Sequence, residues 1–238
     1  MSDKNVIIIG ASSDIGTALS QGWQERGWNV YGTYRTKPRE GLVYCDLADG
    51  ASVRSVWADF YYTYWDALVM CPGALEPIAP FSECRFAEWQ ESVTVNFMNQ
   101  MQIVHLLLPN RRKDATVLFF AGSGTNSAPL NYSAYTVSKI ALIKMTELLA
   151  AEIPDTKFVV LGPGWVDTKI HREVPPRDVV WTPMEKVLSF CDWAIDAPRE
   201  AVSGRNFSFY DRWESQSLSE ELIMDDDMYK LRRHRNDY

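Results

Sequence analysis

The chain has 238 residues, of which 46% are apolar, and it carries a formal net charge of −7. This length and apolar content predict a single domain over residues 1–238 with a sizeable core, and they exclude an intrinsically disordered chain. The negative charge argues against nonspecific nucleic-acid binding, and no apolar run approaches the roughly 20 residues of a membrane span. Because the four cysteines lack metal-ligand spacing and no signal peptide precedes the first apolar run, we expect a cytoplasmic protein.

Short apolar runs alternate with longer amphipathic stretches along the chain, which is the pattern of a parallel sheet covered by helices. The pattern predicts seven strands, at Asn5–Ile9, Asn29–Thr33, Gly41–Cys45, Ala67–Met70, Thr116–Ala121, Lys157–Gly162 and Asn206–Tyr210. It predicts five helices, at Asp14–Arg26, Gly50–Tyr62, Phe86–Leu108, Ser133–Glu152 and Pro183–Ala194. We therefore expect an α/β fold with one doubly wound parallel sheet and helices on both of its faces.

Two segments lack clear periodicity. Residues 165–183 are rich in Pro and predict a mobile loop of irregular structure. Within the C-terminal tail at 211–238, the part from Asp225 onward is acidic and then basic, which is typical of a solvated arm. If the loop covers a substrate, its aromatic and basic side chains suit a polar ligand of the carbohydrate type, although ordinary loop packing explains them equally well. These side chains are Trp165, His171, Arg172, Arg177 and Trp181.

A turn with widely spaced glycines follows the first predicted strand. The turn, Gly10-Ala-Ser-Ser-Asp-Ile-Gly16, leads directly into a predicted helix, whose N-terminal N–H groups can hold a pyrophosphate. The Asp14 carboxylate either points toward those phosphates or caps the helix. The spacing alone is common, so the turn indicates a nucleotide site only in combination with other motifs. The candidate ligands are Gly10, Ser12, Ser13, Asp14, Ile15 and Gly16.

The end of the second predicted strand indicates which dinucleotide such a site would hold. In this fold, a carboxylate at that point binds the ribose hydroxyls of NAD. Here the strand ends in Tyr31-Gly-Thr-Tyr-Arg35, which has no acid and offers an arginine instead. Because arginine forms charge-assisted bonds to phosphate, NADP(H) is favoured and NAD(H) is the alternative. A plain surface role for Arg35 stays open.

A phenol and an ammonium lie four residues apart in Tyr135-Thr-Val-Ser-Lys139, on one face of a predicted helix. We expect the positive charge of Lys139 to lower the pKa of Tyr135, so that the phenol acts as a general acid toward a carbonyl oxygen. Ser123, at the end of an apolar strand, is the candidate donor that polarises that carbonyl. The pair arises readily by chance, and it gains meaning from the preceding strand and the nucleotide loop.

Together these motifs resemble the short-chain dehydrogenase/reductase family, and the resemblance extends to about Tyr210. It implies a Rossmann fold in which Lys139 also holds the nicotinamide ribose and Asn96, in Thr94-Val-Asn96, supports a proton-relay water. The Pro-Gly loop Gly162-Pro-Gly-Trp-Val-Asp-Thr168 corresponds to the segment that contacts the nicotinamide carboxamide. Further positions implied in cofactor binding are Asp46 and Leu47 after the third strand, Gly73 after the fourth, and Pro163, Gly164, Val166 and Thr168 in the Pro-Gly loop.

Three departures from the family pattern stand out. Asp14 replaces the middle glycine of the nucleotide loop, and Cys71-Pro-Gly-Ala74 stands where the family usually has Asn-Asn-Ala-Gly. Ser123 precedes Tyr135 by one residue fewer than usual, so that Gly122 has the usual spacing, and Ser127 is a weaker substitute. We expect such changes to affect rate or cofactor affinity before they affect the fold.

The sequence thus predicts an NADP(H)-dependent oxidoreductase that interconverts a ketone and a secondary alcohol, with a sugar or sugar phosphate as the candidate substrate. The alternatives are a catalytically silent NADP-binding regulatory protein and an acyl-chain carbonyl reductase, whose carrier-protein partner would need a basic entrance at Arg111, Arg112 and Lys113. We expect a homodimer or homotetramer that associates through Phe86–Leu108 and Ser133–Glu152. A metal site has no support, because His105, His171 and His234 are scattered.

Overall fold

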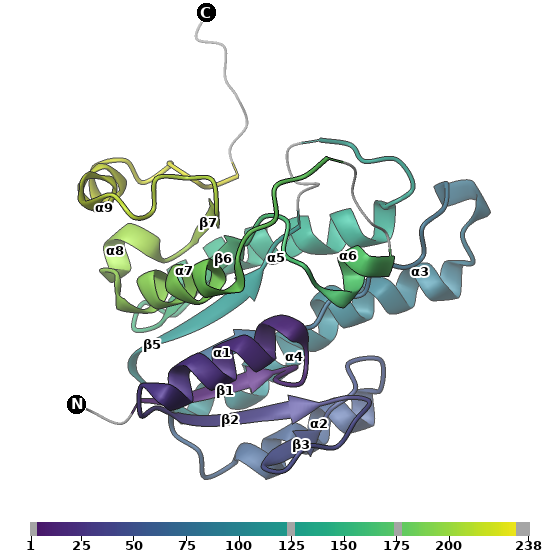
Figure 1. The fold of residues 1–238 in the computed structure, drawn as a ribbon, viewed down its shortest axis with the longest axis horizontal. Coiled ribbons are helices and arrows are strands. Elements are labelled where there is room, and N and C mark those ends of the chain that lie inside the picture. Colours follow the sequence, from purple (N-terminus) through teal and green to yellow (C-terminus); the bar gives the residue numbers. More distant parts are fainter. Residues whose placement is uncertain (1–3, 123–126, 174–177, 232–238) are drawn as a thin grey trace, which may run out of the picture.

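One parallel sheet organises the fold (Figure 1). The computed structural model describes residues 4–122, 127–173 and 178–231. Within them, seven strands pair in the order β3-β2-β1-β4-β5-β6-β7, every pair parallel. The strands are β1 (Asn5–Ile9), β2 (Asn29–Tyr34), β3 (Leu42–Tyr44), β4 (Trp65–Met70), β5 (Arg111–Phe120), β6 (Lys157–Gly162) and β7 (Arg205–Ser208). The predicted fold, a doubly wound α/β sheet of seven strands, is confirmed.

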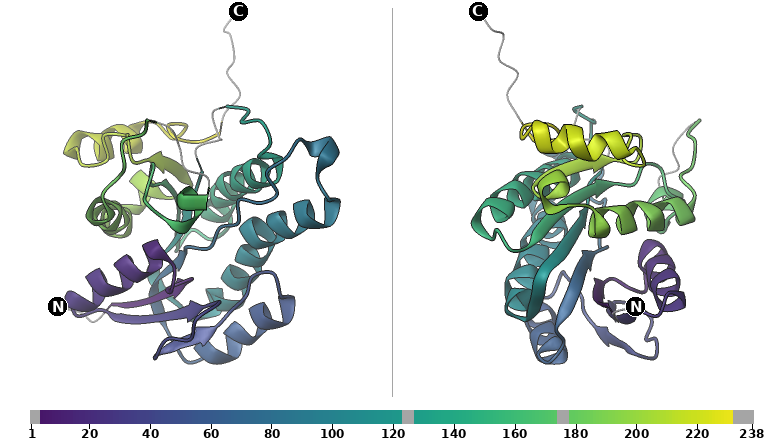
Figure 2. Two further views of the ribbon diagram at one scale, coloured as in Figure 1. Left: turned by 45° about the vertical axis from the view of Figure 1, so that its right-hand side comes forward. Right: turned by 90° about the vertical axis from the view of Figure 1, so that its left-hand side faces the viewer.

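Helices cover both faces of the sheet, because the side chains of each strand alternate between the two faces. In β1, Val6 and Ile8 belong to one buried cluster, whereas Ile7 and Ile9 belong to the other. Among the described residues, no helix is long and apolar enough to span a bilayer. The first face is covered by α1 (Asp14–Glu25) and α7 (Met184–Asp196), and the second by α2 (Gly50–Phe60), α4 (Asn99–Leu107) and α5 (Ser133–Glu152) (Figure 2).

The helix predicted over Phe86–Leu108 is interrupted by a π-helical turn. It forms as α3 (Phe86–Val93), the π turn η2 (Thr94–Met98) and α4. Such single π turns widen a helix locally and occur often at functional sites. Asn96 lies within this turn and is completely buried. The interruption therefore places a polar amide inside the protein, where it needs partners of its own.

The segment after β7 packs against the fold. The solvated arm predicted from Asp225 needs correction in part, because Asp225–Asp227 are exposed but Met228 and Tyr229 pack against the cluster on the α7 face. Here α8 (Arg199–Val202) precedes β7, and α9 (Gln216–Met224) follows it. Trp213, Leu218 and Leu222 are buried in the cluster on the α7 face. The buried Arg205 guanidinium donates to three main-chain carbonyls of α9 and of the residues after it. Residues 232–238 lie outside the described residues.

Two other element predictions need correction. The segment predicted as an irregular loop contains a short helix, α6 (Lys169–Glu173). The strand β5 begins at Arg111 rather than Thr116, because Arg111 pairs with Trp65 ahead of an irregularity in the β4–β5 register. The charged residues at the start of β5 hid this part of the strand from hydrophobic patterning.

Candidate active site

A tight loop joins β1 to α1, and the glycines at its two ends leave the backbone there without side chains. Gly10 has a φ of 78°, in the left-handed region that favours glycine, and its N–H donates to Thr33 Oγ1 at 2.8 Å. A Cβ at Gly16 would lie 2.2 Å from the Gly10 carbonyl oxygen, so no side chain fits there. The Ser13 hydroxyl accepts the Gly16 N–H at 3.1 Å and caps α1. The first turn of α1 therefore presents N–H groups beside a cradle without side chains, which fits a diphosphate.

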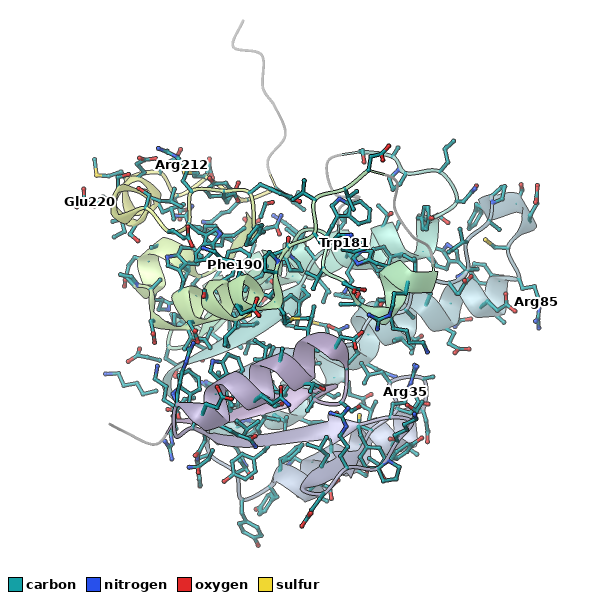
Figure 3. All side chains as sticks on the ribbon, viewed as in Figure 1. Arg35, Arg85, Trp181, Phe190, Arg212 and Glu220 are labelled. Carbon is teal, nitrogen blue, oxygen red and sulfur yellow. The ribbon has the colours of Figure 1, made fainter. Side chains whose placement is uncertain are left out.

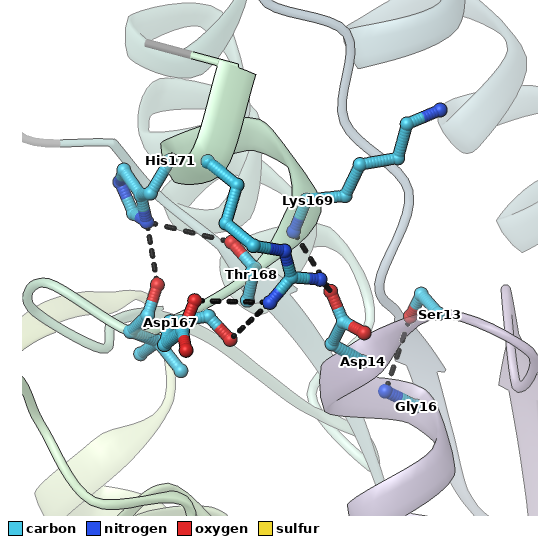
Figure 4. A network of polar contacts seen from close by, with 9 residues as sticks. Ser13, Asp14, Gly16, Asp167, Thr168, Lys169 and His171 are labelled. Atoms are coloured by element: carbon cyan, nitrogen blue, oxygen red, sulfur yellow. Dashed lines mark hydrogen bonds and ion pairs between the residues drawn. The ribbon is translucent and has the colours of Figure 1, made fainter. Parts of the chain in front are cut away.

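The Asp14 side chain takes neither of the two orientations that the sequence left open. Its Oδ2 atom accepts the main-chain N–H of Lys169 at 2.8 Å and a guanidinium N–H of Arg172 at 2.9 Å (Figure 4). Ser13 caps α1 in its place. The carboxylate at the head of the nucleotide loop is thus bonded to α6 and not to α1. Of the other predicted loop residues, the Ser12 N–H donates to the Thr33 carbonyl and Ile15 packs on the core.

Arg35 lines a cavity of about 370 Å³ beyond the end of β2 (Figure 3). Asp46 lines the same cavity, and its Oδ1 accepts the Ala48 N–H at 2.9 Å. The Leu47 side chain is buried, and its carbonyl accepts from Asn99 Nδ2 at 2.6 Å, so only main-chain atoms of Leu47 remain for a ligand. Of the predicted adenosine-side residues, Arg35 and Asp46 therefore line one cavity, whereas Leu47 and Gly73 are not part of its lining. The remaining lining includes Glu76, Glu88 and Glu91.

The turn after β4 is braced by side chains from the interrupted helix. Asn96 accepts the Ala74 N–H at 2.8 Å and donates to the Ala74 carbonyl at 2.7 Å. Gln100 donates to the Pro72 carbonyl at 3.1 Å. A Cβ at Gly73 would lie 3.8 Å from Asn96 Oδ1, so the glycine and the amide face each other. These bonds hold the turn after β4 in place, and the contribution of Gln100 was not predicted.

Tyr135 and Lys139 lie together at the start of α5, below the end of β5. The Lys139 ammonium donates to the Phe120 carbonyl at 2.9 Å and lies 5.6 Å from the centroid of the Tyr135 ring. Burial raises the pKa of Tyr135 to about 12 and lowers the pKa of Lys139 to about 8, with the nearby Cys71 thiol opposing the second change. The expected lowering of the Tyr135 pKa is wrong, because burial of the phenol disfavours its charged form.

The Tyr135 hydroxyl lies against Gly122. A Cβ at Gly122 would lie 2.7 Å from the hydroxyl oxygen and 2.5 Å from Cε1 of the same ring. A serine with the usual family spacing would therefore require the Tyr135 ring to shift from this position. Ser123, the predicted carbonyl donor, is the next residue and lies outside the described residues, whereas Ser127 is exposed.

The Pro-Gly loop is held by contacts at both of its ends. Gly164 has a φ of 74°, and a Cβ there would lie 2.6 Å from Thr182 Oγ1. The Val166 side chain is buried, and its carbonyl bonds His171 Nδ1 at 2.6 Å. Thr168 Oγ1 lies 3.4 Å from the same nitrogen. His171 therefore links the two positions that were predicted to contact the nicotinamide, and Pro163 is half-buried beside them.

Aromatic rings surround His171. Its ring centroid lies 5.0 Å from that of Trp165 and 5.9 Å from that of Trp181. By contrast, the basic residues at the start of β5 lie at the amino ends of the strands, away from the carboxyl ends that carry the site. There Arg111 pairs with Asp155, and Arg112 pairs with Asp66. Among the described residues, no group of three or more His, Cys, Asp or Glu side chains is arranged to hold a metal ion.

A family model described as short chain dehydrogenase matches residues 4–178. The chain is 24% identical over 182 residues to an uncharacterized oxidoreductase of Schizosaccharomyces pombe, an alignment that covers 71% of this chain and 73% of the relative. It is 22% identical over 262 residues to a short chain dehydrogenase of Aspergillus terreus, with coverages of 93% and 84%.

Solved structures show the same fold. A short chain dehydrogenase of Shigella flexneri, complexed with NADP, has a TM-score of 0.80 and 18% identity, and the match covers 89% of this chain and 98% of that one. The family model spans well over half of the chain and includes both the nucleotide loop and the Tyr135–Lys139 pair. The chain is therefore a member of the short-chain dehydrogenase/reductase family of oxidoreductases.

Proposed function

We propose that this enzyme reduces a ketone to a secondary alcohol, reversibly, with NADP(H) as the hydride carrier. The observation that carries the proposal is the position of Tyr135 and Lys139. They lie below the carboxyl end of β5, near the bare loop that follows β1, with the phenol against a residue that has no side chain. In doubly wound folds, ligands bind outside the carboxyl ends of the strands at the point where the strand order reverses, which here is between β1 and β4.

Arg35 supports the choice of NADP(H). It lines the cavity next to Asp46, beyond the end of β2, where the adenosine ribose of a dinucleotide lies in this fold. An arginine at that point pairs well with a 2′-phosphate. The Shigella flexneri relative is complexed with NADP, and a second structural neighbour, BdcA, is in complex with NADPH at a TM-score of 0.76 and 22% identity.

The dinucleotide supplies the hydride, and the chain's own residues handle the proton and the carbonyl. With a pKa of about 12, the Tyr135 hydroxyl holds its proton at neutral pH, which is the state that a general acid needs. It donates that proton to the carbonyl oxygen as the carbonyl carbon is reduced. Ser123 is proposed to donate a hydrogen bond to the same oxygen, and Lys139 to hold the nicotinamide ribose.

The remaining assignments rest on the resemblance and on the contacts already described. Asn96 is proposed as the relay support, and the main chain of Val166 and the hydroxyl of Thr168 as contacts to the nicotinamide. The aromatic rings around His171 suit the faces of a sugar, whereas the basic residues proposed for an acyl carrier lie at the amino ends of the strands. Exposed apolar side chains in η2 and α5, at Met98, Val137 and Leu148, support association through these elements.

The test is a titration with NADPH and with NADH that follows energy transfer from tryptophan to the reduced nicotinamide. We expect tighter binding of NADPH, and a loss of about tenfold in Arg35→Ala that NADH binding does not share. Arg212→Ala is the matched control, because Arg212 is an exposed arginine that pairs with Glu221 of α9 and does not line the cavity (Figure 3). Equal affinity for both dinucleotides in all three proteins would refute the NADP(H) assignment.

A ketone panel that contains ketoses and sugar phosphates then tests the chemistry. We expect turnover with at least one compound and a loss of at least a hundredfold in Tyr135→Phe, because the phenylalanine has no proton to give. Tight NADPH binding without turnover on any compound would favour the silent regulatory protein. Near-parental turnover in Tyr135→Phe would show that another residue is the acid.

A further inference from the structure

A single carboxylate joins two segments that lie 155 residues apart in sequence. Asp14 is the first residue of α1, and its Oδ2 atom accepts the N–H of Lys169, the first residue of α6. The same oxygen accepts from Arg172, whose guanidinium also donates to Asp167 Oδ1 at 2.9 Å (Figure 4). We call the bonds from Asp14 to Lys169 and Arg172 the clasp. The first N–H group of α6 is thus bonded to a side chain from the nucleotide loop.

The helix α6 also contacts the other side of the crevice in which the dinucleotide is proposed to lie. Ile170 Cδ1 lies 3.5 Å from the position that a Cβ on Gly73 would occupy, in the turn after β4. The clasp joins α6 to the loop after β1. Because β1 and β4 are neighbours at the point where the strand order reverses, α6 spans the crevice between their carboxyl ends. A dinucleotide bound in that crevice lies under α6.

We propose that Asp14 is a positioning residue that holds α6 over the bound dinucleotide and thereby slows its exchange. The proposal rests on the proposed function, because it requires a dinucleotide site between β1 and β4. It also explains why an acid is tolerated beside a diphosphate. The Arg172 guanidinium, which also pairs with Asp167, offsets part of the negative charge that would otherwise repel the ligand.

This positioning role and a purely electrostatic role of Asp14 predict opposite effects on the rate of NADPH release. If Asp14 acted only through its charge, its removal would slow NADPH release, and removal of the Arg172 charge would accelerate release. If the two residues act together as a clasp, removal of either one accelerates release, because α6 loses the same anchor. The effect should be modest, because the Asp14 and Arg172 side chains are 39% and 53% exposed.

The experiment is stopped-flow measurement of NADPH association and dissociation, followed by energy transfer from tryptophan. The variants are Asp14→Ala, Asp14→Asn and Arg172→Gln. The matched control is Arg212→Gln, because Arg212 is an exposed arginine paired with Glu221 near α9, away from the nucleotide loop (Figure 3). We expect the dissociation rate to rise about three- to tenfold in Asp14→Ala and in Arg172→Gln, and to stay within about twofold in the control.

Asp14→Asn provides the conservative rescue. Its amide oxygen still accepts the Lys169 N–H, so we expect NADPH to dissociate more slowly from Asp14→Asn than from Asp14→Ala. A purely electrostatic role of Asp14 predicts the same NADPH dissociation rate for both variants. Trypsin cleavage after Lys169, measured by mass spectrometry, should also be faster in Asp14→Ala than in the parent protein.

Slower NADPH release in Asp14→Ala, or rates within twofold of the parent in both Asp14→Ala and Arg172→Gln, would overturn the clasp and leave the proposed function intact. If the parent protein bound no dinucleotide, the proposed function and the clasp would both fail.

Discussion

Replacing Lys139 by methionine should make this protein more stable at neutral pH and less stable at high pH. Lys139 is 4% exposed, and its Nζ atom donates to the Phe120 carbonyl. Burial lowers its pKa from 10.5 to about 8. The difference between those values corresponds to about 3 kcal/mol of unfavourable free energy for keeping the ammonium in the folded protein.

The sign of the pH dependence follows from proton binding. Below pH 8 the lysine is charged in both states, so the burial cost is fully present. Between pH 8 and 10.5 the unfolded state binds more protons than the folded state, so the stability of the parent protein rises with pH through this window. Methionine has no such cost, but it loses the bond to the Phe120 carbonyl, worth about 1 kcal/mol. We expect Lys139→Met to be about 2 kcal/mol more stable at pH 7 and about 1 kcal/mol less stable at pH 11.

The assay is urea unfolding followed by tryptophan fluorescence at several pH values between 7 and 11. The difference between the two proteins reports Lys139 together with its coupling to the Cys71 thiol, because the other buried thiols and Tyr135 titrate in both. Lys144→Met is the control, since Lys144 lies on the same helix with 49% of its side chain exposed and pairs with Glu147. A difference between Lys139→Met and the parent that stays constant to within about 0.5 kcal/mol across this range would refute the reasoning.

Three further substitutions test the geometry of the site and the tail. Gly122→Ala should push the Tyr135 ring out of place and lower kcat at least tenfold while NADPH affinity stays unchanged; unchanged kcat would contradict the contact. Gly16→Ala should weaken NADPH binding at least tenfold, because its Cβ would collide with the Gly10 carbonyl, and unaltered affinity in a titration would disprove the cradle. Arg205→Met should destabilise the protein by about 2–4 kcal/mol in urea unfolding, because three carbonyls lose a buried donor, and a neutral result would mean that water replaces it.

The seven strands of a parallel sheet, the nucleotide loop and the Tyr135–Lys139 pair could all be predicted from the sequence, whereas the order of the strands came from the structure. Strands buried on both faces need continuous apolar runs, such as Val6–Ile9, and such runs are visible without tertiary information. The four-residue spacing of the pair fixes a shared helix face by local geometry alone. Glycines at both ends of the first loop mark a backbone that no side chain can approach.

Other features depended on neighbours that are distant in sequence. The partners of Asp14 come from α6, and a short helix capped by another segment carries no local signal of its own. The tail packs because Trp213 and Leu222 complete a cluster that β7 and α7 begin. The sequence alone determined which groups stand next to each other on one strand or helix. Only the tertiary structure decided which groups are buried away from water and which charged groups come into contact. For this reason burial raises the pKa of Tyr135, although the neighbouring Lys139 had led us to predict a lower pKa.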